Sequence, residues 1–304
     1  MEVQALDVIV AGAHFSLGGS GSPPKRVRQS SAIVIPARLA STRLPRKLLL
    51  ADTGKPLIQH TYEAALQATR PGGVLVAADS EEIAAAVRRF GGRVELTSPD
   101  CASGSDRVAE IACRLPNVDI VVNVQGDEPE ISAQAIDLAV ELLESDPTAA
   151  MSTLAAPIRS RERLLDPSCV KVVLDGRGRA IYFSRAPIPF ARTWDDALLA
   201  ADPPHYYQHI GLYAYRRDFL LQLASLPRPP IERLENLEQL RVLYAGHPIL
   251  VGMIGDPTTG IDTPDDYKAF VSRCCGSSAS HDCGDALSAG IRGTHAPGKM
   301  DRRR

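Results

Sequence analysis

A basic loop follows the first strongly apolar run of the chain and could bind a polyphosphate. The run at residues 32–35 predicts a buried strand that Pro36 ends, and the loop after it is rich in cations and hydroxyls. These residues are Arg38, Ser41, Thr42, Arg43, Arg46 and Lys47. Arginine binds phosphate oxygens bidentately and lysine acts as a point charge, so the composition suits such a ligand. The alternative is a solvated basic loop that its prolines keep out of a helix.

Two acidic positions could bind a magnesium ion. Asp127 directly follows the longest apolar run, residues 120–124, and Gly126 beside it permits close approach of a ligand. Magnesium prefers one or two carboxylates together with substrate phosphates, so a second carboxylate should come from elsewhere. Asp262 offers one, although Asp262 or Thr263 could instead cap a helix.

Three polar residues share one face of a predicted helix over residues 234–244. Glu235, Glu238 and Gln239 have the i, i+3, i+4 spacing that places side chains together. Such a group is ordinarily a solvated face.

Ser184–Arg185 and His209–Tyr213 lie at the ends of predicted strands. The usual explanation for such residues is the polar rim of a sheet. His209 and Tyr213 are an even number of residues apart, so both side chains should point to the same side of a strand.

Two common glycine motifs are not found. The cluster at residues 18–21 has Pro24 where the third glycine of G-x-G-x-x-G is needed, and Gly54–Lys55 is followed by Pro56 rather than serine or threonine. Dehydrogenase and P-loop interpretations therefore lose their main support.

Strands and helices alternate through the first half of the chain. The predicted strands are 32–35, 74–78, 94–96 and 120–124, and the predicted helices are 57–69, 81–90, 103–113 and 132–143. This alternation indicates an α/β fold, a mostly parallel sheet with helices on both faces. Ligands of such sheets bind beyond the carboxyl ends of the strands, where the basic loop and Asp127 lie.

The second half is richer in strands. Residues 151–156, 170–174, 180–184 and 210–215 are strand-like, and the helix over 234–244, a strand over 249–253 and a helix over 264–271 follow. We predict one catalytic domain over residues 31–273 with a β-rich insertion at about 151–215. The Ser/Gly-rich ends, 1–30 and 274–304, are predicted to be disordered tails.

Composition excludes several classes of protein. Of the 304 residues 44% are hydrophobic, and 34 Lys and Arg against 36 Asp and Glu give a net charge of −2. The tails carry +1 and +2, which leaves −5 on residues 31–273. No general basic field attracts nucleic acid or anionic lipid, and no uncharged run reaches the roughly 18 residues of a membrane span.

The cysteines indicate a reducing compartment. Cys101, Cys113 and Cys169 are scattered singly, and no clear signal peptide precedes them, so we expect a cytoplasmic protein. Cys274, Cys275 and Cys283 lie near the C-terminus, where free thiols are favoured over a zinc site because adjacent cysteines lack finger spacing.

Taken in order, these motifs resemble the 3-deoxy-manno-octulosonate (Kdo) cytidylyltransferase family, also called CMP-Kdo synthetases. The resemblance covers residues 31 to about 273. It is carried by Ile35–Arg38, Ser41–Pro45 with Lys47, Gly54–Pro56, Ser103–Arg107, Val122–Pro129, Val170–Val173, Tyr182–Arg185, His209–Tyr213, Leu237–Arg241 and Asp262–Pro264.

The resemblance implies a Rossmann-like nucleotide-diphospho-sugar transferase fold, a mixed sheet with a β-rich dimerisation insertion. It implies a homodimer that converts CTP and Kdo to CMP-Kdo and pyrophosphate for lipopolysaccharide synthesis, with Mg²⁺ as cofactor. Arg38, Lys47, Asp127 and Asp262 would be the catalytic residues, and the two aspartates would bind the metal. The implied CTP-binding residues are Arg38, Ser41, Arg43, Lys47, Ser103, Gly104, Ser105 and Gln125. The implied Kdo-binding residues are Gln125, Ser184, Arg185, His209, Tyr213, Glu238 and Gln239.

The chain departs from the family pattern at Arg46, where the family usually has Gly, and at Ala78, where it often has Thr. Arg46 adds a bulky cation to the phosphate loop. Other interpretations are a cytidylyltransferase for 8-amino-Kdo or a neuraminic acid, and a non-catalytic nucleotide-binding protein of the same fold. The presence of Lys47, Asp127 and Asp262 argues against the last.

Overall fold

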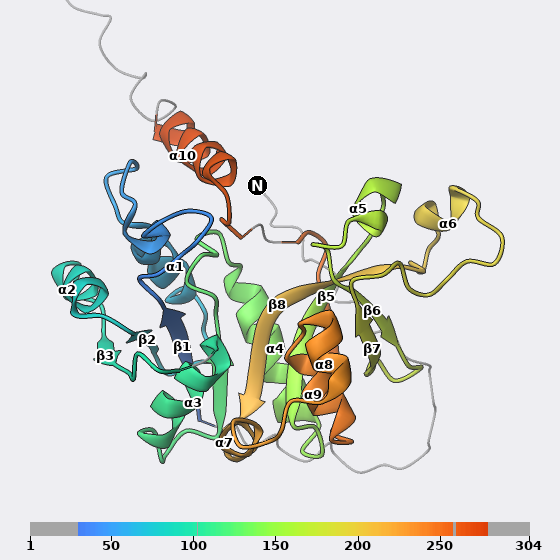
Figure 1. Ribbon diagram of the computed structural model, residues 1–304, viewed down its shortest axis with the longest axis horizontal. Coiled ribbons are helices and arrows are strands. Elements are labelled where there is room, and N and C mark those ends of the chain that lie inside the picture. The colour runs from blue at the N-terminus through green and yellow to red at the C-terminus, as the bar shows by residue number, and fades with distance from the viewer. Residues whose placement is uncertain (1–29, 102, 258–259, 279–304) are drawn as a thin grey trace, which may run out of the picture.

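The strands form one mixed sheet. In the computed structural model, which describes residues 30–101, 103–257 and 260–278, the strands are β1 (Ser31–Ala37), β2 (Val74–Ala78), β3 (Val94–Leu96), β4 (Ile120–Asn123), β5 (Met151–Pro157), β6 (Lys171–Leu174), β7 (Ala180–Ser184), β8 (Tyr207–Arg216) and β9 (Ile249–Met253). They pair in the order β3-β2-β1-β4-β8-β5-β9, and β6 joins β7 to β8. β8 runs antiparallel to β4 and β5, whereas β1 to β4 pair in parallel (Figure 1).

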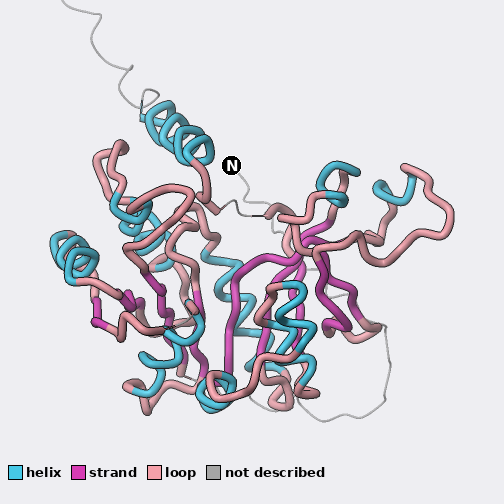
Figure 2. The backbone as a smooth tube through the Cα atoms, viewed as in Figure 1, coloured by secondary structure: helices cyan, strands magenta, loops and turns pink. Residues whose placement is uncertain are grey.

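Helices cover both faces of this sheet, as predicted (Figures 1 and 2). Ile33 and Ile35 of β1 face one apolar cluster, while Val34 between them faces the other, because successive strand residues alternate. The first cluster is completed by α1 (Leu57–Ala65), α2 (Glu81–Arg89), α4 (Ala133–Ser145) and α10 (Pro264–Ser278). The second is completed by α3 (Gly104–Cys113), α7 (Arg217–Leu223) and α9 (Gln239–Tyr244), with α8 (Pro230–Glu235) beside α9.

Pro36 does not end the first strand, contrary to the expectation from sequence. β1 continues to Ala37, with Pro36 opposite Ala77 of β2. The pairing of β1 with β4 stops at Val34. At Pro36 the strand is therefore paired on one side only, and a residue without an N–H is tolerated there.

The β-rich region at 151–215 is less separate than predicted. β5 and β8, which lie near its two ends, are adjacent strands of the main sheet. The β6–β7 hairpin and the segments that carry α5 (Arg161–Leu165) and α6 (Ala197–Ala200) project from it, and a small apolar cluster around Tyr206 and Leu199 packs those segments. The role of residues 151–215 in dimerisation stays a prediction.

The predicted helix over residues 234–244 is two helices. Asn236 has φ 51° and ψ 53°, the left-handed conformation, and ends α8. α9 begins at Gln239, after Glu238. Glu235 and Glu238 therefore belong to different turns of chain and do not share a helical face. The sequence holds no proline or glycine at this break, so the spacing alone suggested one continuous helix.

The last described helix is longer than predicted. α10 runs to Ser278, five residues past the expected domain end at 273, because Phe270, Val271 and Cys274 continue an apolar stripe against the core. Cys274 is partly buried and Cys275 is exposed, and neither forms a disulfide with another described cysteine. Cys283 and most of both predicted tails lie outside the described residues, so their predicted disorder is not tested. Among the described helices, none has the length and apolar character needed to cross a membrane.

Candidate active site

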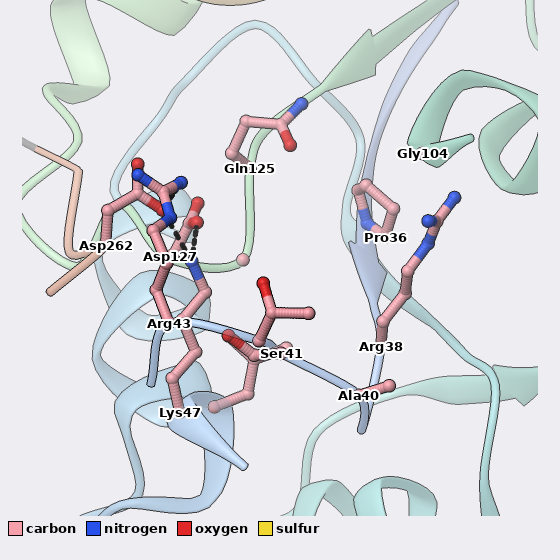
Figure 3. Close-up of a pocket in the computed structure, with 13 residues that line it drawn as sticks. Pro36, Arg38, Ala40, Ser41, Arg43, Lys47, Gly104, Gln125, Asp127 and Asp262 are labelled. Atoms are coloured by element: carbon pink, nitrogen blue, oxygen red, sulfur yellow. Dashed lines mark hydrogen bonds and ion pairs between the residues drawn. The ribbon is translucent and has the colours of Figure 1, made fainter. Parts of the chain in front are cut away.

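A cavity of about 360 Å³ opens beyond the carboxyl ends of β1 and β4 (Figure 3). This is the position at which parallel α/β sheets bind their ligands. Most of the predicted nucleotide and metal residues line it. They are Arg38, Ser41, Arg43, Lys47, Gly104, Gln125, Asp127 and Asp262, joined by Pro36, Ala40, Thr42, Leu48 and Gly126.

The basic loop wraps one side of this cavity. The loop ends at a short 3₁₀ helix, Lys47–Leu49, and the first residue of that helix, Lys47, lines the cavity. Arg46 precedes this helix with φ 55°, a left-handed conformation that favours glycine. Its guanidinium pairs with Glu82 of α2. A glycine would adopt this conformation without strain, whereas Arg46 adopts it with a Cβ.

Lys47 joins the two carboxylates that were predicted to bind a metal. Its Nζ donates to Asp127 Oδ2, and to Asp262 Oδ1 at 3.0 Å and the Ile261 carbonyl at 3.1 Å. Arg43 Nη2 lies 2.9 Å from the same Asp262 oxygen. Burial opposes the charge of Lys47, but the two carboxylates outweigh burial and raise the pKa of Lys47 above its ordinary value. Lys47 is therefore a fixed cation over the neutral pH range.

Asp262 does not cap the helix that follows it. Thr263 Oγ1 accepts from the Asp266 N–H at 3.2 Å, and Asp266 Oδ2 accepts from the Thr263 N–H at 2.8 Å, a reciprocal capping arrangement. The Asp262 N–H also donates to Asp266, at 3.1 Å. With Thr263 in the capping role, the Asp262 carboxylate faces the cavity.

The donor set fits a magnesium ion. Asp127 and Asp262 both contact a single ammonium nitrogen, so their hard oxygen ligands converge on one region of the cavity. The described residues hold no group of three or more His, Cys, Asp or Glu side chains suited to a metal. Magnesium is usually bound by one or two carboxylates, and phosphate oxygens and water supply its remaining ligands. The two aspartates match this arrangement.

The start of α3 borders the cavity on the side of Pro36 and Arg38, across from Asp127 and Asp262 (Figure 3). Ser103 and Asp106 form a capping box, with bonds of 3.1 and 2.9 Å, and this fixes the first turn. Gly104 lies in the cavity wall, where an added Cβ would be 3.5 Å from the Pro36 ring. Ser103 does not line the cavity itself; it caps α3 and so fixes the position of Gly104, which does. Ser105 bonds Tyr215 of β8 and does not line the cavity.

Gln125 and Gly126 form the back of the cavity at the end of β4. A Cβ at Gly126 would lie 3.1 Å from the Pro36 carbonyl oxygen, so only glycine fits without displacement of β1. Thr61 of α1 donates to the Gly126 carbonyl at 2.9 Å and holds this turn. Gln125 Nε2 donates to Asn123 Oδ1 at 3.3 Å.

His209, Tyr213 and Gln239 form a second cluster next to Gln125. Tyr213 pairs with Asn123 in the β8–β4 register, and its ring lies 5.4 Å from that of His209, which confirms that the two point to one side. Tyr213 Oη donates to Gln239 Oε1 at 3.4 Å. The Gln239 side chain is buried, and its Nε2 has no hydrogen-bond partner among the described residues. A buried amide donor left open in this way indicates a place for a ligand oxygen.

His209 is buried and neutral. Its Nε2 lies 2.9 Å from Thr153 Oγ1, which also contacts the carbonyls of Ile210 and Leu212 at 3.0 and 2.8 Å. The hydroxyl proton goes to a carbonyl, so the His209 ring donates to the hydroxyl. Burial lowers the pKa of His209 to about 3.

Ser184 and Arg185 do not line the cavity, and their predicted contact with Kdo stays a prediction. Ser184 Oγ donates to Glu235 Oε1 at 2.5 Å, and the Arg185 N–H donates to Glu235 Oε2 at 2.9 Å. Both residues therefore hold the end of α8. Glu238 is partly buried ahead of α9, next to Gln239.

Three acidic residues that were not among the predicted site residues also lie around the site. Asp79 Oδ1 accepts from the Leu39 N–H at 3.0 Å, and Glu82 pairs with Arg46, so both hold the basic loop. Glu128 lies beside β8, since a Cβ at Gly211 would be 3.8 Å from its Oε1, and beside Gly260, where a Cβ would be 3.9 Å from its side chain. The position of Asp79 at a strand end was the available signal; Glu82 carried none beyond its place at the start of α2.

Comparison with known proteins agrees with this geometry. The family model described as cytidylyltransferase matches residues 32–249. The 3-deoxy-manno-octulosonate cytidylyltransferase of Rhodopirellula baltica is 52% identical over 242 residues, 79% of this chain and 97% of the relative. That of Geobacter sulfurreducens is 46% identical over 244 residues, with the same coverage.

A solved structure gives the same result. The structure of CMP:2-keto-3-deoxy-manno-octonic acid synthetase complexed with CTP matches with a TM-score of 0.76 and 40% identity, over 82% of this chain and 99% of that one. The likeness therefore extends from motifs to the whole fold. The chain belongs to the cytidylyltransferase family, in the group of the 3-deoxy-manno-octulosonate cytidylyltransferases.

Proposed function

We propose that this protein transfers CMP from CTP to Kdo, giving CMP-Kdo and pyrophosphate for lipopolysaccharide synthesis. The observation that carries the proposal is the meeting of Asp127 and Asp262 on Lys47 in a cavity that also holds Arg38 and Arg43. Cations for a triphosphate and carboxylates for a divalent ion stand together there. The 52% identical relative supports the choice of substrate.

In the proposed reaction the C2 hydroxyl oxygen of Kdo forms a bond to the α-phosphorus of CTP. The bond between that phosphorus and the bridging oxygen of pyrophosphate breaks, and the hydroxyl proton leaves to water. Such a displacement needs positioning and charge neutralisation more than covalent help from the protein.

The basic loop supplies the charge. Arg38 and Arg43 lie on opposite sides of the cavity, so their guanidinium groups would bind phosphate oxygens from two directions (Figure 3). Lys47 stays protonated because of its carboxylate neighbours. Ser41 and the first turn of α3, with Gly104 in the wall, would border the nucleotide.

Asp127 and Asp262 would hold Mg²⁺. When bound, the ion supplies neutralisation of the phosphate charge and acidifies a hydroxyl that it contacts. The carboxylates now share Lys47, and Arg43 also neutralises Asp262. These cations keep two carboxylates close together without mutual repulsion, so the pair is organised before the substrates bind.

Kdo would bind between Gln125 and the second cluster. The open Nε2 of Gln239 can donate to sugar or carboxylate oxygens, and the Tyr213 hydroxyl, whose proton goes to Gln239, can accept from a sugar hydroxyl. Glu238, beside them, can accept from sugar hydroxyls. His209 is neutral and bonded to Thr153, so its part is to support Tyr213 through ring packing.

The test is release of pyrophosphate from CTP with Mg²⁺ and a panel of sugar acids: Kdo, 8-amino-Kdo and a neuraminic acid. We expect turnover with Kdo. Turnover with one of the others alone would assign that sugar acid instead. CTP binding without turnover on any of them would favour a non-catalytic nucleotide-binding protein.

Two isosteric variants test the metal assignment. We expect Asp127→Asn and Asp262→Asn each to lower kcat by at least about 100-fold, because an amide cannot replace a carboxylate ligand of magnesium. Asp218→Asn is the matched control, since that side chain is 87% exposed on α7. Full activity of either site variant would contradict the assignment.

We also propose that the enzyme is a homodimer and acts in the cytoplasm. The projecting β6–β7 hairpin and its exposed Ile181 support an interface in that region. Light scattering after gel filtration would measure twice the mass of the 32.7 kDa chain. A monomer at micromolar concentration would contradict the dimer.

A further inference from the structure

Glu235 is the acceptor for the end of β7. Its two carboxylate oxygens take the Ser184 hydroxyl at 2.5 Å and the Arg185 N–H at 2.9 Å. The Ser184 hydroxyl in turn accepts from the Ala186 N–H at 3.0 Å. Hydrogen bonds to a charged carboxylate are stronger than those between neutral groups, so this contact ties α8 firmly to the hairpin.

The Arg185 side chain extends the same contact. Its Nε donates to the Glu235 carbonyl at 2.7 Å, and its Nη2 reaches the Asn236 carbonyl at 3.4 Å. Its Nη1 donates to the Pro167 carbonyl at 3.0 Å. Each guanidinium nitrogen thus donates to a main-chain oxygen, and two carbonyls at the end of α8, those of Glu235 and Asn236, gain a donor.

Lys171 holds Arg185 from behind. The lysine is fully buried, and its Nζ donates to the carbonyls of Asp166, Cys169 and Arg185 at 3.0, 2.6 and 2.5 Å. Those three bonds use all three ammonium protons. The main chain at Arg185 is therefore fixed relative to β6.

A buried ion pair closes the other side of the α8–α9 turn. Arg241 donates to Glu232 at 2.8 and 2.5 Å, and both side chains are buried. Asn236 turns the chain between them in the left-handed conformation. Together with Glu235, this pair determines the direction in which α9 starts, and Gln239 is the first residue of α9.

We propose that Glu235 is a positioning residue which, bonded by Ser184 and Arg185, sets the α8–α9 turn so that the Gln239 amide faces the sugar acid beside Tyr213. The inference rests on the proposed function, because it assumes that Gln239 contacts Kdo. It reassigns Ser184 and Arg185 from binding Kdo to supporting Gln239. Figure 1 shows α8 and α9 alongside the β6–β7 hairpin, and α9 contacts β7.

The first experiment compares Glu235→Gln and Ser184→Ala with the unchanged enzyme. Glu235→Gln replaces one acceptor oxygen by a donor, and Ser184→Ala removes the hydroxyl that bonds both Glu235 and the Ala186 N–H. We expect the KM for Kdo to rise about tenfold with the KM for CTP unchanged, because displacement of the turn affects only the sugar-acid side. Glu81→Gln is the matched control, since Glu81 is 65% exposed on α2. An equal rise of both KM values would overturn the proposal.

A double-mutant cycle with Gln239→Ala separates positioning from general destabilisation. If Glu235 acts through Gln239, Glu235→Gln changes the KM for Kdo by less than about twofold once Gln239 is alanine. The same tenfold rise in both backgrounds would overturn the proposal. Turnover of the unchanged enzyme with Kdo is measured first. If the unchanged enzyme does not turn over Kdo, the proposed function is contradicted. If it does, and the rise in KM is the same in both backgrounds, only the role of Glu235 is contradicted.

Discussion

Acid should destabilise this protein through His209, and replacing that residue should remove much of the effect. The side chain is 8% exposed, and burial lowers the pKa of His209 to about 3 from an ordinary value of 6.5. The folded state therefore keeps the ring neutral at a pH where the unfolded chain takes up a proton. Stability from this residue is complete above pH 6.5 and is lost as the pH falls toward the folded-state pKa.

The magnitude follows from proton linkage. Between pH 6.5 and 3 the free energy of unfolding should fall by about 1.4 kcal/mol for each pH unit on account of His209. At pH 5.0 the loss is about 2 kcal/mol relative to pH 7.5, and this value holds for any folded-state pKa below about 4.5. Carboxylates whose pKa is lowered, such as Asp266 and Glu110, lose their contribution only at lower pH.

The assay is urea unfolding at pH 7.5 and pH 5.0 for the unchanged protein and for His209→Gln. The glutamine amide can still donate to Thr153 but does not titrate. Any cost of the substitution itself is the same at both pH values. We expect the variant to lose about 2 kcal/mol less than the unchanged protein on acidification. His60→Gln is the control. The pKa of His60 is also lowered, by burial and by Lys55, but the side chain is less buried than that of His209, so this substitution should change the loss of stability less.

An equal loss of stability in the unchanged protein and in His209→Gln would refute the reasoning. It would mean that water or an acidic partner reaches the ring and that His209 can be charged in the folded state. His209 could then bind the Kdo carboxylate directly, which the neutral, Thr153-bonded ring does not favour.

The other predictions concern the phosphate loop and the chain ends. Lys47→Met should lower kcat/KM for CTP by about 100-fold or more in the pyrophosphate assay, whereas an unchanged value would remove Lys47 from the catalytic set. Arg46→Gly should be more stable than Arg46→Ala by about 1 kcal/mol in urea unfolding, because φ 55° strains alanine but not glycine and both variants lose the Glu82 contact; the reverse order would contradict the left-handed conformation. Deleting residues 1–29 or 279–304 should leave kcat and both KM values unchanged, and a loss of activity would show that an end supports the site.

Local patterns in the sequence were enough for the class of fold and for most of the cavity. The alternation of short apolar strands with amphipathic helices predicted the two-faced sheet, and the loop after β1 and the turn after β4 each contain their site residues within a few positions. These signals are local because a strand end and the loop after it are consecutive in the chain. Resemblance to known motifs then added the residues that spacing could not connect.

Tertiary structure decided which residues act together. Lys47 and Asp262 are 215 positions apart and meet because α10 begins beside the carboxyl end of β4. The break at Asn236 separates Glu235 from Glu238 but does not interrupt the helical spacing of the sequence. The left-handed conformation of Asn236 depends on the packing of α8 and α9 against the rest of the protein. Ser184 and Arg185 belong to a motif of the resemblance that implied contact with Kdo, yet both donate hydrogen bonds to Glu235. Sequence determined the local chemistry of each segment; only packing between distant segments decided which of these groups remain open to a ligand.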